Sequence, residues 1–200
     1  MKHFLLTAVI VVCFAACNNG KNYTATTKNA DGTETKTSVD VKSMSTATDE
    51  MNKKIEELKK LTPYTLDQLK ALLPAELNGM KQSNYNSSTA MGYALISADY
   101  KKDDTTSLQV SVYDCAGEAG SAWYGMAYWS KMSFQQESST EYTKTVDFMG
   151  GKAVENYNNQ SKRASLTFAA NDRLLVVLQG DNMKPDELKE AAQKLNLKVS

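Results

Sequence analysis

The chain has 200 residues, with 23 Lys and Arg balanced by 23 Asp and Glu, and a single histidine. This balance indicates neither a nucleic-acid-binding surface nor a polybasic membrane patch. The length suits one folded domain plus a tether. We therefore expect no nucleic-acid partner.

The first residues have the composition of a membrane-targeting signal. Lys2 and His3 precede an apolar run at residues 4–16, and the chain turns polar directly after Cys17. A basic start followed by roughly a dozen apolar residues is typical of a secretory signal. The run is too short to span a bilayer, which needs about 20 apolar residues. With the small residues Ala15 and Ala16 before Cys17, the segment resembles the lipobox of Gram-negative bacterial lipoproteins.

This resemblance implies cleavage before Cys17 and a lipid on its thiol, which anchors the protein to a membrane without spanning it. Asn18 follows the cysteine, and residues 18–23 carry no acidic cluster. By the same resemblance, these residues imply the inner leaflet of an outer membrane, with the domain facing the periplasm. An ordinary secretory signal with an incidental cysteine is the alternative.

Cleavage at this position would limit the chemistry of the mature chain. It removes His3 and Cys13, and the lipid occupies Cys17, so Cys115 is the remaining thiol. Removal of Lys2 leaves 22 basic against 23 acidic residues, a net charge of −1. One thiol without a histidine excludes an intramolecular disulfide and a structural zinc site. We expect no cofactor and no metal.

The polar stretch at residues 18–46 is expected to be a flexible tether. It has hardly any bulky apolar side chain and cannot offset the entropy of ordering. A coil of about 29 residues reaches roughly 30 Å on average. The Thr-rich alternation on both sides of Asn29-Ala30-Asp31-Gly32 leaves a local hairpin as the alternative.

Two N-terminal helices are expected within residues 47–76. The first begins near Thr48, carries one apolar stripe of Met51, Ile55 and Leu58, and ends at Thr62-Pro63. The second covers residues 66–73. Thr65 and Gln68 have the spacing of a capping box at its start.

From residue 77 to 200 the pattern predicts a globular α+β domain. Hydrophobic alternation with a period of two places strands at 80–85, 91–100, 107–113, 141–148, 152–157, 163–169 and 174–179. The last is continuously apolar and is therefore expected at the centre of the sheet. Helices are expected at 117–132 and from Pro185 onward. The predicted fold is a mostly antiparallel sheet of about six or seven strands backed by helices.

The expected helix at 117–132 carries the candidate ligand or partner contact. A helical wheel places Trp123 and Met126 on the core side, and Tyr124 and Tyr128 on the opposite side with Lys131. Two stacked, exposed tyrosines would form a platform for a sugar, a peptide or a partner protein. Packing of both rings against the N-terminal helices is the alternative.

The sequence predicts no catalytic residue. Cys115 lies where a strand gives way to a helix, a position that can activate a thiol. No histidine can act as its base, and Asp114 fits a helix N-cap, so we expect a buried, inert cysteine. A histidine-free hydrolase would need two carboxylates placed by the fold. Its possible members are Glu118, Glu137, Glu141 and Asp147.

A second resemblance covers residues 77–197. The strand-turn-strand segment 163–179, with Asn171-Asp172 at its turn, followed by the helix at 185–195, resembles the PsbP-like fold. Members of that fold are mostly non-enzymatic accessory or binding proteins. The sequence therefore favours an anchored binding or scaffolding domain that contacts an envelope protein. A glycan- or peptide-binding protein is the alternative.

Overall fold

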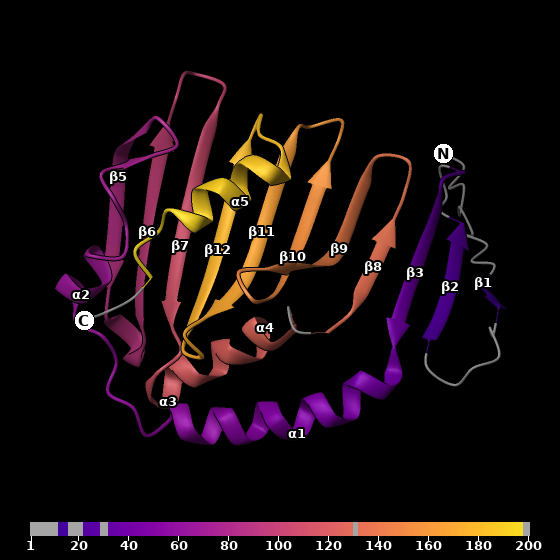
Figure 1. Cartoon of the computed structure of the whole chain (residues 1–200), viewed down its shortest axis with the longest axis horizontal. Coiled ribbons are helices and arrows are strands. Elements are labelled where there is room, and N and C mark those ends of the chain that lie inside the picture. The colour runs from indigo at the N-terminus through magenta and orange to yellow at the C-terminus, as the bar shows by residue number, and fades with distance from the viewer. Residues whose placement is uncertain (1–11, 16–21, 29–31, 130–131, 198–200) are drawn as a thin grey trace, which may run out of the picture.

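A computed structural model describes residues 12–15, 22–28, 32–129 and 132–197. One large antiparallel sheet dominates the molecule, with 46% of residues in strands and 24% in short helices (Figure 1). The expected α+β domain with six or seven strands is therefore wrong. Eleven strands, β2 to β12, form the sheet within these residues, and the short β1 adds a twelfth at one edge.

The first six strands are β1 (Val12–Ala15), β2 (Asn22–Lys28), β3 (Glu34–Asp40), β4 (Glu76–Leu77), β5 (Met80–Ser88) and β6 (Ala94–Lys101). The others are β7 (Ser107–Asp114), β8 (Phe134–Glu137), β9 (Glu141–Phe148), β10 (Gly151–Asn158), β11 (Arg163–Ala170) and β12 (Leu174–Asp181). The α-helices are α1 (Val41–Leu58), α2 (Leu66–Lys70), α3 (Gly117–Gly120), α4 (Tyr124–Trp129) and α5 (Pro185–Gln193). Two 3₁₀ turns are η1 (Ala90–Gly92) and η2 (Ser121–Trp123).

The strand order is β1-β2-β3-β8-β9-β10-β11-β12-β7-β6-β5-β4. β12 pairs with β11 on one side and β7 on the other, which confirms its predicted central position. Leu174, Leu175, Val176 and Leu178 have no exposed surface. This continuous burial explains why the strand lacks the alternation of a one-sided strand.

The expected tether is largely a hairpin. β2 pairs with β3 over its full length, and the hydroxyls of Thr24 and Ser38 lie 3.1 Å apart across the pair. β3 continues into the main sheet by pairing with β8. Low hydrophobicity suggested disorder here, but threonine favours strands, and the main sheet supplies the missing partner.

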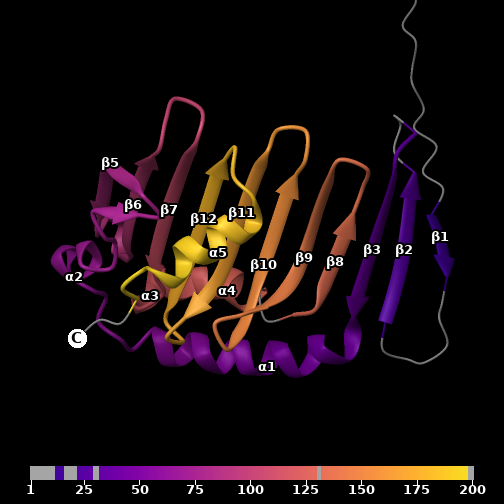
Figure 2. The ribbon, with the colours of Figure 1, turned by 45° about the horizontal axis from the view of Figure 1, so that its top comes forward.

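Helices cover both faces of the sheet (Figures 1 and 2). α5 crosses β10, β11 and β12 on one face, above a core that includes Val110, Leu166 and Leu178. On the other face, α4 lies against β11 and β12 and is contacted by α1. Gly180 permits the close approach of α5, because a Cβ there would lie 2.8 Å from Leu188 Cδ1.

The expected helix at 117–132 is broken into α3, η2 and α4. A 3₁₀ turn advances about 120° per residue instead of 100°, so it rotates the part of the helix that follows it. Over three residues this rotation amounts to only about 60°, and the larger change is that α1 packs over the side of the helix that was expected to be open. Tyr124 and Tyr128 are 1% and 6% exposed, whereas Met126 is 52% exposed.

The N-terminal helices agree better with the sequence pattern. α1 begins at Val41, earlier than expected, and its predicted stripe packs inward with Leu58 fully buried. The Thr65 hydroxyl accepts from the Gln68 amide, and the Gln68 side chain accepts from the Thr65 amide, as the capping box predicted. Across the described ranges, no helix is both long and apolar enough to span a bilayer.

Candidate functional site

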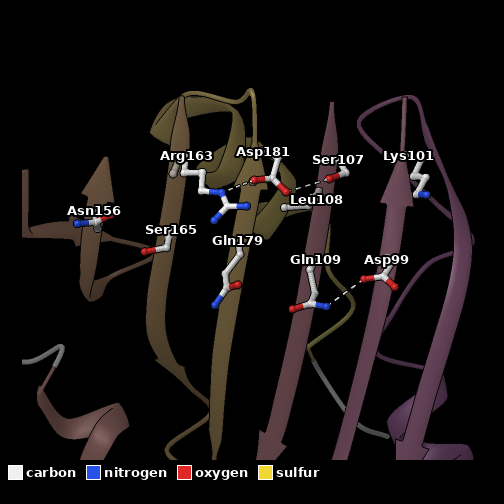
Figure 3. A pocket seen from close by; sticks show the side chains of 12 residues that line it. Asp99, Lys101, Ser107, Leu108, Gln109, Asn156, Arg163, Ser165, Gln179 and Asp181 are labelled. Atoms are coloured by element: carbon white, nitrogen blue, oxygen red, sulfur yellow. Dashed lines mark hydrogen bonds and ion pairs between the residues drawn. The ribbon is translucent and has the colours of Figure 1, made fainter. Parts of the chain in front are cut away.

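A row of polar side chains crosses the face of the sheet that α5 does not cover. It consists of directly paired residues on five adjacent strands: Asp99, Gln109, Gln179, Ser165 and Asn156. We call this set the polar row. Because side chains alternate between the two faces of a strand, register alone places all five on one side. Figure 3 shows them pointing to a common surface.

The polar row lines a hollow of about 400 Å³. Beside it runs a charged row of Lys101, Ser107, Asp181 and Arg163, again paired strand to strand. Arg163 Nε donates to Asp181 Oδ1 at 2.7 Å, and the Ser107 hydroxyl donates to Asp181 Oδ2 at 3.4 Å. The hollow therefore offers donors and acceptors along two parallel rows about 7 Å apart.

The hollow carries a balanced charge. Two of its lining residues are acidic, Asp99 and Asp181, and two are basic, Lys101 and Arg163. Asp99 Oδ1 also accepts from Gln109 Nε2 at 3.1 Å, and Asp181 is paired with Arg163. The hollow thus carries no net formal charge, which gives no electrostatic preference for an anionic or a cationic ligand.

An aromatic cluster adjoins this face. Tyr113 lies on β7 two alternations beyond Gln109, and its ring centroid is 4.8 Å from that of Trp123. The ring centroids of Tyr93 and Trp123 are 5.9 Å apart. All three side chains are partly exposed. These rings give a rigid contact area about 13 Å along β7 from Gln109, outside the lining of the hollow.

The predicted contact residues Tyr124 and Tyr128 do not lie in the hollow. They pack beneath α1 in a cluster with Leu58, Cys115 and Leu175, so the packing alternative describes their position. The Tyr128 hydroxyl donates to Glu50 Oε2 of α1 at 3.0 Å. Both rings are part of the hydrophobic core, so α4 presents no exposed pair of tyrosines.

Cys115 is fully buried, as expected. Burial, and then the nearby charge of Asp114, raise the pKa of its thiol to about 12. Asp114 is not the predicted helix N-cap. Its carboxylate binds the Arg173 guanidinium through two contacts of 2.7 Å and also accepts from the Tyr64 amide.

Sequence reasoning missed a second buried acid, Glu155, on the face covered by α5. Its carboxylate accepts from the Tyr142 hydroxyl at 2.7 Å and lies 2.5 Å from Lys189 Nζ and 3.5 Å from Lys144 Nζ. Burial by itself would raise the pKa of Glu155, but the bonds and charges of these partners outweigh it and lower the pKa. This group clamps α5 onto β10 and lies on the opposite face from the hollow.

The four carboxylates considered for a hydrolase do not converge. Glu118 lies on α3, and Glu137 lies on β8 directly opposite Tyr142, so its side chain and that of the adjacent Glu141 point to opposite faces of the sheet. Glu141 and Asp147 stand at opposite ends of β9, about 20 Å apart. The structure contains no cluster of three or more metal-ligating side chains within its described ranges. Cys17, the predicted lipidation site, lies outside these residues.

No family model, curated protein or solved structure matches this chain. The polar row is thus identified by geometry alone. The sequence contained one sign of this polar face: Gln109 and Ser111 alternate with buried valines on β7. The pairing of β7 with β12 and β12 with β11 was needed to bring the row together.

Proposed function

We propose that this protein is a lipid-anchored lipoprotein of the bacterial envelope whose domain binds an uncharged glycan without catalysis. The anchor is an acyl group on Cys17, and the domain faces the periplasm from the inner leaflet of the outer membrane. The hollow along the polar row is the binding site. This proposal keeps the binding domain expected from the sequence but moves the contact surface from α4 to the sheet.

The continuity of the polar row across five strands is the observation that carries the proposal. A side-chain amide donates and accepts hydrogen bonds at once, and a hydroxyl does the same. Sugar hydroxyls need this mixed partner set. The balanced charge of the hollow suits a neutral ligand.

A non-catalytic role is supported by the partners of the buried ionisable groups. Asp114 is held by Arg173, Glu155 is held by Lys189 and Tyr142, and the high pKa of Cys115 keeps it a neutral thiol. These groups lie away from the hollow and serve the packing of helices and loops. We infer that they stabilise the fold rather than act on a ligand.

Lipid anchoring is tested by metabolic labelling of the full-length chain with radioactive palmitate in a Gram-negative host. We expect label on the mature protein and none on a Cys17→Ser variant. Mass measurement of the mature N-terminus reports whether cleavage occurs before Cys17. Equal labelling of both proteins, or cleavage elsewhere, would refute the anchor.

Glycan binding is tested by titrating the purified mature protein with chitotetraose, whose units carry hydroxyl and acetamide groups. The double variant Gln109→Leu/Gln179→Leu should weaken binding by about 1–3 kcal/mol, or roughly 5- to 150-fold. Gln135→Leu is the matched control, because this exposed amide lies on the other face of the sheet. Binding that resists the double variant, or that Gln135→Leu weakens equally, contradicts the site. A protein partner recovered from envelopes and lost with the same double variant would contradict the glycan class.

A further inference from the structure

The two edges of the sheet are built differently. The β4 edge is only two residues long and follows Pro74, and the β5–β6 pairing next to it is shifted by a bulge between Gln82 and Asn84. Short strands, prolines and bulges prevent an edge from pairing with another chain. β2, near the other edge, is seven residues long, contains no proline and carries one charged residue, Lys28.

Processing would change what covers β2. In the full-length chain, β1 pairs with the outer side of β2, from Val12 opposite Thr27 to Ala15 opposite Thr24. Cleavage before Cys17, which belongs to the proposed function, removes β1. The main-chain groups of β2 that faced β1 then lie at an open edge. The signal segment thus occupies this edge until the protein is processed.

We propose that the β2 edge of the mature protein pairs with the β2 edge of a second copy. An antiparallel pair that uses all seven residues of both strands must centre on the middle residue, Ala25. The pairs are then Ala25 with Ala25, Thr24 with Thr26, Tyr23 with Thr27, and Asn22 with Lys28. Cross-strand threonine pairs are favourable, and no two lysines face each other.

Charge and location also favour a second copy as the partner. Lys28 Nζ lies 3.7 Å from Glu34 Oε1 in its own hairpin, so its charge is already matched. Residues 17–21 reach at most about 17 Å from the lipid to β2, which keeps this edge near the bilayer. Anchoring both copies in one leaflet raises their effective concentration. The symmetry axis is perpendicular to the sheet, so the polar rows of both copies face the same side.

Disulfide crosslinking of the mature, membrane-anchored protein tests the dimer. In Ala25→Cys, the two introduced residues would have Cα atoms about 4.5–5.5 Å apart, within disulfide range. Lys28→Cys is the matched control on the same strand, because its symmetry mate is about 20 Å away. The native Cys115 is buried and does not compete. With copper phenanthroline as oxidant, we expect several-fold more crosslinked dimer at position 25 than at 28.

Substituting Ala25 with residues of opposite charge gives an independent test of the dimer in variants that keep their fold. Ala25→Lys and Ala25→Glu should each be monomeric in detergent with a thermal midpoint close to that of the parent. A mixture of the two should form a heterodimer. Equal crosslinking at 25 and 28, no crosslinking at 25, or a crosslink to a different protein would overturn the dimer. Palmitate labelling of the same preparation separates these failures from failure of the anchor.

Discussion

Removing one partner of the buried ion pair between Arg173 and Asp114 should cost far more stability than removing one partner of a surface pair of the same length. Arg173 contacts both Asp114 oxygens at 2.7 Å, donates to the Thr62 carbonyl at 2.7 Å and lies 3.6 Å above the Tyr64 ring centroid. It thereby fixes the loop between α1 and α2 to the ends of β7 and β12. The Asp114 carboxylate is fully buried.

Replacing Arg173 with alanine leaves this buried carboxylate without its cationic partner. Removal of one partner of a buried pair typically costs about 3–5 kcal/mol. Asp114 keeps hydrogen bonds from the Tyr64 and Ala116 amides, so we expect the lower end, about 3 kcal/mol. Arg173→Lys keeps the charge but loses the two-pronged contact and should cost about 1.5–3 kcal/mol.

Arg163→Ala is the matched control. Arg163 Nε also lies 2.7 Å from a carboxylate oxygen, that of Asp181, but its side chain is 71% exposed against 17% for Arg173. An exposed pair contributes about 0–1 kcal/mol. Urea unfolding followed by circular dichroism measures both variants. If Arg173→Ala and Arg163→Ala cost the same free energy, burial does not determine the strength of this contact, and the reasoning fails.

Three further predictions follow from the buried groups. Because the pKa of Glu155 is lowered in the folded protein, its contribution to stability is present above the unfolded-state pKa near 4.5 and is lost as the pH falls through the folded-state pKa. The midpoint of unfolding should therefore fall less steeply with decreasing pH in Glu155→Gln than in the parent protein. Cys115, with its pKa raised to about 12, should react with iodoacetamide at pH 8 only after unfolding, as read by mass spectrometry, and fast labelling of the native protein would show an open thiol. Tyr124→Ala should lower the free energy of unfolding by about 3–5 kcal/mol because the ring is buried against Leu58, and an unchanged thermal midpoint would contradict this packing.

The sequence predicted the strands whose apolar residues alternate. β7, β9, β11 and β12 begin at their predicted residues, and the burial of Leu108, Val110 and Val112 confirms the predicted face of β7. Hydrophobic alternation suffices in these cases because the strands lie over the main core. β8 was missed, and the β2–β3 hairpin was only the alternative to a tether, because these strands carry mostly polar side chains. Their order comes from pairing within the sheet, which local composition does not encode.

The candidate site could not be predicted from the sequence for a related reason. Each member of the polar row is an ordinary polar residue on its own strand, and only the register joins Asn156 to Gln179 through Ser165. The predicted exposure of Tyr124 and Tyr128 was wrong because α1 packs over this side of α4, a long-range contact that a helical wheel does not show. The inert state of Cys115, by contrast, followed from the lack of a nearby base and agrees with its burial.

The central position of β12 determines when the protein can fold during its synthesis. β7 emerges from the ribosome long before its partner, because Ser107–Asp114 must wait for Leu174–Asp181. The earlier strands form two separate blocks, β4 to β7 on one side and β1 to β3 with β8 to β11 on the other, and β12 joins them. Such late, long-range pairing slows folding. The complete sheet therefore cannot form until its last strand, β12, has been made.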